Sequence, residues 1–269
     1  MRQFHAYERP EPFRASAVRL TRLYIDAELA PGSVVELPPE TASHVARVLR
    51  ARVGDQLILF NGDGREFTAA IEAIRGSRVS ASIDSALAVD RESPFAVTLV
   101  QCVPRGDRMD FVVQKATELG VARIVPVLSQ RGVVRLDARQ AESKSIHWRA
   151  VAASACEQCG RNRLPVIQTV QPLLNYLGEL TSNHARRWVL EPESAASAGR
   201  SLQPADHGRA DPMGAAEIAV GPEGGFAAEE LEAFRIAGFA QVGLGPRVLR
   251  TETAAIAALV WMQVHFGDL

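Results

Sequence analysis

The hydrophobic positions of the chain follow two patterns, and the change between them falls near residues 91–95. Between residues 21 and 90, short stretches such as TRLYID, QLILF and EFTAAIEAI are separated by turns, of which NGDG at 61–64 is the strongest. Short strands joined by tight turns are typical of a small β-barrel. One amphipathic helix near residues 40–50 interrupts them, and Thr41 or Ser43 is its expected N-cap.

After residue 94, continuous apolar strands alternate with helices, beginning with the strand AVTLVQCV at 96–103 and a helix at 107–120. This alternation predicts a mostly parallel α/β sheet. We therefore expect an N-terminal extension at 1–20, a β-barrel domain at 21–92 and an α/β domain at 93–269. Residues 194–215 are small, polar and proline-containing, which predicts a surface loop within the second domain.

Composition places the chain among ordinary globular proteins. It has 269 residues, of which 47% are hydrophobic and 23% charged, so a sizeable core can be buried. We expect no membrane association, because no apolar run approaches the roughly 18–20 residues that a spanning helix needs. The first twenty residues carry charges and prolines in place of an apolar signal region, so a cytoplasmic location is expected.

Cysteine and histidine give little support for a metal site. The chain has three cysteines, and two of them form the motif CEQC at 156–159. Such a motif is either half of a zinc site or redox pair, or simply two small residues at the end of a long helix. The second interpretation is favoured because no further ligand pair follows at zinc spacing. The six histidines are scattered along the sequence, and we expect no metal.

The net charge of −1 gives no bulk attraction to nucleic acid, but basic residues are locally concentrated. Residues 131–163 contain seven basic and three acidic residues, a local net charge of +4. This segment is either a phosphate-facing surface or a solvated helix face. The same two alternatives apply to His44, Arg47 and Arg50, which lie on the helix of the first domain.

The first candidate site is AVGPEGGF at 219–226, where a buried strand runs into a glycine-rich turn before a helix. Ligands of open α/β sheets bind beyond the carboxyl ends of strands, and glycines let the backbone approach them closely. The turn lacks the dinucleotide fingerprint and the lysine of a phosphate-binding loop. Its alternative is a plain strand-to-helix connection.

The second candidate site is GLGPRVLRTETAAIAAL at 243–259. Another strand ends in glycines, and Arg247 and Arg250 bracket an apolar pair before the last helix. Thr251 is the expected N-cap of that helix, and Glu252 lies in its first turn, where its charge suits the helix dipole. Capping alone does not explain the two arginines. The alanines that follow would allow another helix or strand to approach closely.

Together, GPEGGF and LGPRVLRTETA resemble the C-terminal signature of the SPOUT methyltransferases. More narrowly, the chain is similar to the bacterial 16S ribosomal RNA uridine-N3 methyltransferase family. The similarity extends to RLYID at 22–26, HVARVLR at 44–50, RGDRMDFVVQKATELGV at 105–121 and CEQCGRNRLPVI at 156–167. The N-terminal extension departs from the family pattern, and Cys159 stands where a serine is expected.

The resemblance implies an α/β domain with a deep trefoil knot, an N-terminal PUA-like β-barrel and a homodimer with its active site near the subunit interface. It implies S-adenosyl-L-methionine as cofactor and 16S ribosomal RNA, or the small ribosomal subunit, as partner. The cofactor loops carried over by position are 190–192, 221–225 and 244–252. Their expected binding residues are Leu190, Glu191, Gly221, Pro222, Glu223, Gly224, Gly225, Leu244, Gly245, Val248, Leu249, Arg250 and Glu252.

For methyl transfer to uridine N3, the protein must align the reacting atoms and help remove the N3 proton. Arg250 is the expected stabiliser of the developing anion, and Glu223 and Glu252 are the candidate bases, with backbone hydrogen bonding or capping as their alternative role. The expected RNA-binding residues are Arg22, His44, Arg47, Arg50, Arg105 and Arg161.

Three other functions remain open from the sequence. A SPOUT enzyme could methylate a ribose 2′-hydroxyl, or the chain could be a non-catalytic RNA-binding protein of the same fold. A nicotinamide-dependent enzyme has the least support, because the dinucleotide fingerprint is missing.

Overall fold

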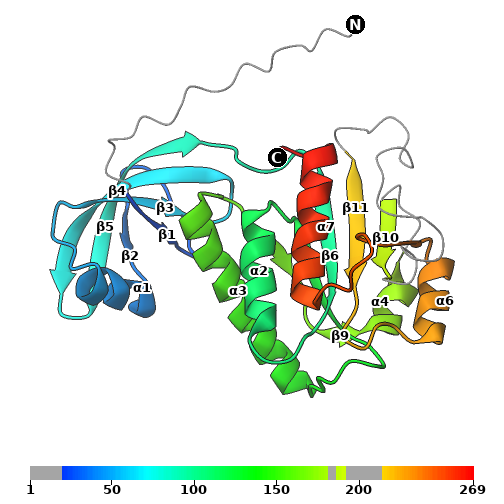
Figure 1. The fold of residues 1–269 in the computed structure, drawn as a ribbon. Coiled ribbons are helices and arrows are strands. Elements are labelled where there is room, and N and C mark those ends of the chain that lie inside the picture. Colours follow the sequence, from blue (N-terminus) through cyan, green and yellow to red (C-terminus); the bar gives the residue numbers. More distant parts are fainter. Residues whose placement is uncertain (1–19, 181–185, 192–213) are drawn as a thin grey trace, which may run out of the picture.

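The computed structural model describes residues 20–180, 186–191 and 214–269, and these residues form two sheets with helices around the second (Figure 1). The expected N-terminal extension, except Leu20, lies outside the described residues. So do Pro192 and all of the expected surface loop except its last two positions.

The first sheet contains five strands among the described residues, in the order β1, β3, β4, β5 and β2. Their bounds are β1 Thr21–Tyr24, β2 Val34–Glu36, β3 Gln56–Phe60, β4 Arg65–Arg75 and β5 Arg78–Ala88. Only the β1–β3 pair is parallel; the other pairs are antiparallel. Alternate positions such as Leu57, Leu59, Phe67, Ala69 and Ile71 fill the core of this sheet, which confirms the predicted strands, although β4 and β5, with 11 residues each, are longer than expected.

The predicted helix of this region is divided into two parts. Helix α1 spans Pro39–Ser43, and a π-helix, η1, continues from His44–Val48. The prediction of Thr41 or Ser43 as N-cap is wrong, since Pro38 occupies that position and Pro39 begins the helix. Proline suits the first helical position because its fixed φ is preorganised and its missing N–H would have had no partner there.

The second sheet confirms the predicted mostly parallel α/β arrangement. Its strand order is β12, β10, β11, β6, β7 and β8, with β9 also paired to β7, and every pairing between the described strands is parallel. The bounds are β6 Ala96–Cys102, β7 Arg123–Leu128, β8 Val166–Ile167, β9 Gln171–Pro172, β10 Arg186–Leu190, β11 Ala215–Val220 and β12 Ala240–Val242.

Helices cover both faces of this sheet, as parallel strands require (Figure 1). Helices α2 Arg108–Glu118, α3 Ala138–Cys159 and α7 Thr251–Phe266 lie on one face, where Met109, Trp148 and Leu259 are buried. Helices α4 Leu173–Glu179 and α6 Ala228–Ile236 cover the other face with Leu177 and Phe234. Among the described helices, none combines the length and apolar character needed to cross a membrane.

Two arginines expected to bind RNA lie in the contact between the first sheet and the segment at the C-terminal end of α3, which we call the seam. Arg161 is only 5% exposed; its guanidinium pairs with Glu92 and donates to the backbone oxygens of Thr117 and Val121 at 2.8 and 3.1 Å. All of these partners belong to the protein, so the structure assigns Arg161 to packing. This burial argues against the RNA contact expected of Arg161, because a buried and paired guanidinium is not presented to phosphate.

Arg22 is the second arginine in the seam. Its guanidinium pairs with Glu66 and donates to Asn162 Oδ1 at 2.7 Å, and only 9% of its side chain is exposed. Arg91 pairs with the same Glu66 carboxylate. Burial alone raises the pKa of Glu66, but its contacts with Arg91 and Arg22 outweigh burial and hold that pKa below its ordinary value. The low exposure of Arg22 argues against its expected RNA contact in the same way.

The CEQC motif closes helix α3, as the sequence predicts. Cys156 is buried, and burial raises the pKa of its thiol to about 12. A thiol that stays protonated at neutral pH is a poor metal ligand and a poor nucleophile. The structure therefore supports the interpretation of the motif as two small packing residues.

Candidate active site

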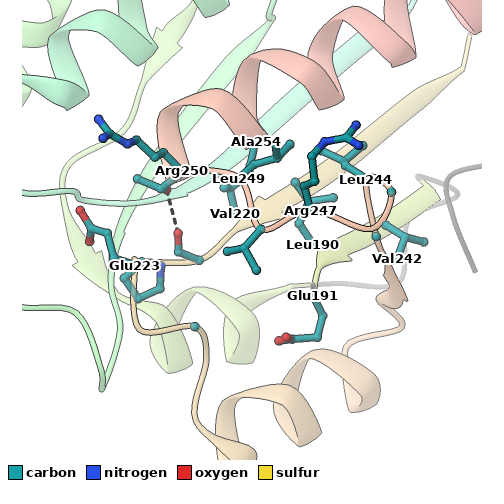
Figure 2. A pocket seen from close by; sticks show the side chains of 17 residues that line it. Leu190, Glu191, Val220, Glu223, Val242, Leu244, Arg247, Leu249, Arg250 and Ala254 are labelled. Carbon is teal, nitrogen blue, oxygen red and sulfur yellow. Dashed lines mark hydrogen bonds between the residues drawn. The ribbon is translucent and has the colours of Figure 1, made fainter. Parts of the chain in front are cut away.

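Three adjacent strands of the second sheet, β12, β10 and β11, end at one edge and enclose a pocket of about 270 Å³ (Figure 2). The segments that follow these strands are the three segments singled out in the sequence. Parallel strands present their carboxyl ends on the same edge, so loops far apart in the sequence meet there. The lining residues are Leu190, Glu191, Val220, Gly221, Pro222, Glu223, Gly225, Val242, Gly243, Leu244, Gly245, Arg247, Val248, Leu249, Arg250, Thr251 and Ala254.

Most of the expected cofactor-binding residues line this pocket. Gly224 and Glu252 do not, although each is next to a lining residue in the chain. The sequence analysis did not select Val220 and Val242, which it placed in strands, or Ala254, which it placed on a small-residue face of the last helix. β11 is buried without interruption from Ala216 to Val220, so its burial pattern gives no sign of which residue is the last before the pocket.

The glycine-rich turn after β11 needs glycine at two positions for different reasons. Gly225 has a φ of 67°, a left-handed conformation, and its N–H donates to Pro222 O at 3.0 Å. At Gly221, a Cβ atom would lie 3.1 Å from the ring of Phe226. A side chain at either position would therefore strain the turn that forms one wall of the pocket.

Thr251 connects the two pocket loops, a role that the sequence analysis missed. Its hydroxyl donates to Gly221 O at 2.8 Å and accepts from Gln101 Nε2 at 2.9 Å. The prediction of Thr251 as N-cap is wrong, since Arg250 occupies that position and Thr251 is the first helical residue. Thr251 is 4% exposed. Its hydroxyl bonds to the turn after β11 and to β6, and not to the backbone of its own helix. Only the tertiary structure brings Gln101 and Thr251 together.

A second connection fixes the far end of the glycine-rich turn. Glu230 is 3% exposed, and its carboxylate accepts from the backbone N–H of Ala227 at 2.8 Å and of Gln130 at 2.7 Å. Arg131, beside Gln130, donates to Gly224 O at 3.4 Å. The segment after β7 therefore supports the turn from outside the pocket.

Arg108, which the sequence analysis did not select, contacts both candidate bases. Its Nη1 pairs with the Glu223 carboxylate, and its Nε lies 3.9 Å from Glu252 Oε1. Arg108 is the first residue of α2 and follows β6, the strand next to β11 in the sheet. The carboxyl end of a fourth strand thus brings a cation to the mouth of the pocket.

The side chains of Arg250 and Arg247 point to opposite sides of the pocket (Figure 2). In Figure 2, the side chains of Arg250 and Glu223 extend toward the same side of the pocket, whereas that of Arg247 extends toward the opposite side. Arg250 is exposed. A guanidinium and a carboxylate on one side of the mouth can stabilise an anion and hold or accept a proton.

Four of the expected RNA-binding residues remain accessible to a partner. His44, Arg47 and Arg50 are exposed on and after η1, and Arg105 is exposed in the segment between β6 and α2. Arg105 lies three residues before Arg108, on the side of the pocket to which β6 leads. These positions are compatible with contacts to phosphate.

The pocket suits an adenosyl group with a positively charged sulfur. Its wall is mainly apolar side chains and glycine backbone, which can cover a purine ring and supply main-chain hydrogen bonds. Glu191 and Glu223 provide the carboxylates among the lining residues. Groups of three or more possible metal ligands are not found in the described part of the chain.

Comparison with known proteins defines the class. Residues 91–263 match the RNA methyltransferase domain model, and residues 37–84 match the RNA methyltransferase PUA domain model. The chain belongs to the RNA methyltransferase family that includes ribosomal RNA small subunit methyltransferase E. The relative of that name from Buchnera aphidicola subsp. Schizaphis graminum is 32% identical, over 93% of this chain and 98% of the relative.

Two solved structures are similar over nearly the whole chain. A putative methyltransferase from Legionella pneumophila, in complex with its bound cofactor SAM, has a TM-score of 0.85 at 42% identity, covering 94% of this chain and 100% of that one. Ribosomal RNA small subunit methyltransferase E from Neisseria gonorrhoeae, bound to S-adenosyl methionine, has a TM-score of 0.80 at 36% identity, covering 93% and 99%.

Proposed function

We propose that the protein transfers a methyl group from S-adenosyl-L-methionine to N3 of a specific uridine in 16S ribosomal RNA. The observation that carries this proposal is the pocket at the ends of β10, β11 and β12, which is walled by glycine backbone. Two arginines, Arg108 and Arg250, and two carboxylates, Glu223 and Glu252, lie at its mouth. Family membership supports methylation of small-subunit ribosomal RNA. The choice of uridine N3 rests on the sequence resemblance.

The cofactor, S-adenosyl-L-methionine, supplies an electrophilic methyl group when it is bound, and the protein contributes position and electrostatics. The glycine loops at 221–225 and 243–245 would hold the adenosyl part through their backbone. Arg250 stabilises the negative charge that spreads over the uracil ring as its N3–H proton leaves. Glu223 and Glu252, which both lie beside Arg108, are the candidate acceptors of that proton.

Exposed apolar residues on α7 support a homodimer. Val260 and Val264, one turn apart, are 37% and 55% exposed, and Ile256 and Ala257 are half-buried beside them. A helix that is apolar on its outer side as well as its inner side is normally covered by another surface. A second copy of the chain on this stripe would bring its own surface close to the pocket, because α7 begins at the pocket.

The remaining structural features are proposed from the resemblance. The segment from β12 into α7 passes the carboxyl edge of β10 and β11, in keeping with a deep trefoil knot there. The first sheet is proposed as a PUA-like β-barrel, with domains at 21–92 and 93–269 after an extension at 1–20. RNA would lie across His44, Arg47, Arg50 and Arg105, and its ribosomal origin implies a cytoplasmic location.

The decisive experiment is transfer of a labelled methyl group to isolated 16S RNA and to small ribosomal subunits, followed by nucleoside analysis. We expect N3-methyluridine as the labelled product. A labelled 2′-O-methyl nucleoside would replace the proposal with the ribose alternative. Tight cofactor binding in calorimetry together with no transfer to either RNA substrate would favour the non-catalytic alternative.

A further inference from the structure

The contacts of Arg108 distinguish the two candidate bases. The cofactor pocket lies over β12, β10 and β11, and the next strand, β6, leads to Arg108 at the start of α2. This side of the pocket is also the side to which Glu223 and Arg250 extend in Figure 2. The acceptor base would therefore approach from the β6 side, where Arg108 contacts both carboxylates.

The two carboxylates are in different environments. Glu223 is paired with Arg108, and its side chain is 39% exposed. The side chain of Glu252 is 14% exposed, and its Oε1 is 3.9 Å from Arg108 Nε. Within the described part of the chain, Glu252 Oε2 is buried and has no hydrogen-bond partner. A buried acceptor without a partner opposes folding, so it calls for an explanation.

We infer that Glu252 accepts the N3 proton, and that Arg108 is a positioning residue that holds Glu223 in an ion pair and orients Glu252. This inference rests on the proposed uridine-N3 methylation. In the balanced step, the N3–H proton passes to Glu252 as the N3–carbon bond forms and the sulfur–carbon bond breaks, leaving its electron pair on sulfur. The protonated Glu252 then releases the proton to water.

The geometry supports this division of roles. The charge-assisted hydrogen bond from Arg108 engages Glu223 Oε1 and holds that half-exposed carboxylate in place. Glu252 Oε2 has no such bond to lose, and its partial burial limits competition from water. A purely structural role, in which Glu252 stabilises the first turn of α7 through the helix dipole, gives no reason for Arg108 to reach both acids.

The test compares Glu252→Gln, Glu223→Gln and Arg108→Ala with Glu232→Gln, which removes a surface carboxylate of α6 paired with Arg235. Single-turnover methylation is measured from pH 5 to 9 by nucleoside analysis. Cofactor and RNA affinities are measured separately. We expect Glu252→Gln to lower the rate about 10²–10⁴-fold, the range of a lost general base, while cofactor and RNA affinities change less than about threefold.

Loss of Glu252 should also change the pH profile. The rate of Glu252→Gln should rise with pH throughout the range, because only the ionisation of uridine itself then supplies the reactive anion. Glu223→Gln should keep the wild-type profile and lose less than about tenfold. Arg108→Ala should lower the rate and shift the profile at unchanged cofactor affinity. The conservative variant Glu252→Asp should recover part of the rate.

Two results would overturn the inference. One is a larger loss for Glu223→Gln than for Glu252→Gln; the other is a wild-type pH profile in Glu252→Gln. Either result leaves the proposed function intact if the wild-type protein makes N3-methyluridine. Absence of N3-methyluridine in the wild-type reaction refutes the proposed function itself, and the inference with it. A third result would also overturn the inference: equal loss of cofactor affinity and rate in Glu252→Gln would show that Glu252 contributes to cofactor binding in the ground state.

Discussion

Arginine–carboxylate contacts occur in two regions of this protein, the seam where the first sheet meets the end of α3 and the mouth of the pocket. In the seam, the side chains of Arg22 and Glu66 are 9% and 11% exposed. At the pocket, those of Arg108 and Glu223 are 41% and 39% exposed. The seam groups are largely enclosed by the protein, although Arg22 Nε lacks a hydrogen-bond partner among the described residues, whereas the pocket groups are accessible to a ligand. Burial, and not residue type, therefore distinguishes the arginines of the seam from those proposed to act at the pocket.

The largest expected effect comes from breaking the seam. Arg161→Leu leaves Glu92 unpaired and removes the donors to two backbone carbonyls. We expect it to lower the free energy of unfolding by about 3–5 kcal/mol, as for other broken buried ion pairs. Denaturant unfolding checks this, with Arg235→Leu on the surface as the control. Loss of RNA affinity with unchanged stability would restore Arg161 to the RNA-binding surface.

The next largest effect is expected at the mouth of the pocket. Arg250→Ala should lower the single-turnover methylation rate about 10²–10³-fold, as when one preorganised donor to a developing anion is removed. Cofactor affinity, measured by calorimetry, should change far less. Equal losses in rate and affinity would show that Arg250 binds the ground state and would remove it from transition-state stabilisation. Arg235→Ala again provides a surface control.

A smaller effect is expected from the hydrogen bonds that join the two pocket loops. Thr251→Val keeps the shape of the side chain but removes its bond to Gly221 O and leaves Gln101 Nε2 without that acceptor. We expect a loss of about 1–3 kcal/mol in unfolding free energy, with weaker cofactor binding in calorimetry. Thr253→Val, at an exposed position of the same helix, should change neither quantity.

The smallest expected effect is a pH dependence of the seam. The pKa of Glu66 is held below its ordinary value in the folded protein, so this group stabilises the fold above the unfolded pKa. That contribution should be lost as the pH falls from about 5 through the lowered folded pKa. Unfolding of the wild type and of Glu66→Gln should therefore differ more at pH 7 than at pH 3. An equal difference at both values would contradict the assignment.

The sequence predicted the residues that line the pocket better than the residues that hold its loops and side chains in place. Glycines at strand ends, such as Gly221 and Gly225, and the arginine before the last helix are local signals that need no tertiary knowledge. No local signal identified Arg108, because the sequence of α2 does not indicate which of its residues faces the loop that follows the neighbouring strand β11. Thr251 was misassigned because its local pattern fits an N-cap, whereas in the folded protein its hydroxyl bonds to Gly221 and Gln101 on other strands.

By itself, the sequence determined the two-part organisation, the strand–helix alternation, the short strands of the first sheet and the three segments that form the pocket. These features depend on periodicity and on residues with restricted backbone conformations, which act over a few positions. The tertiary structure decided the strand order, the place of Arg108 beside Glu223 and Glu252, and the burial of Arg22 and Arg161. These depend on which distant residues supply hydrogen bonds and exclude water, and local sequence does not encode that.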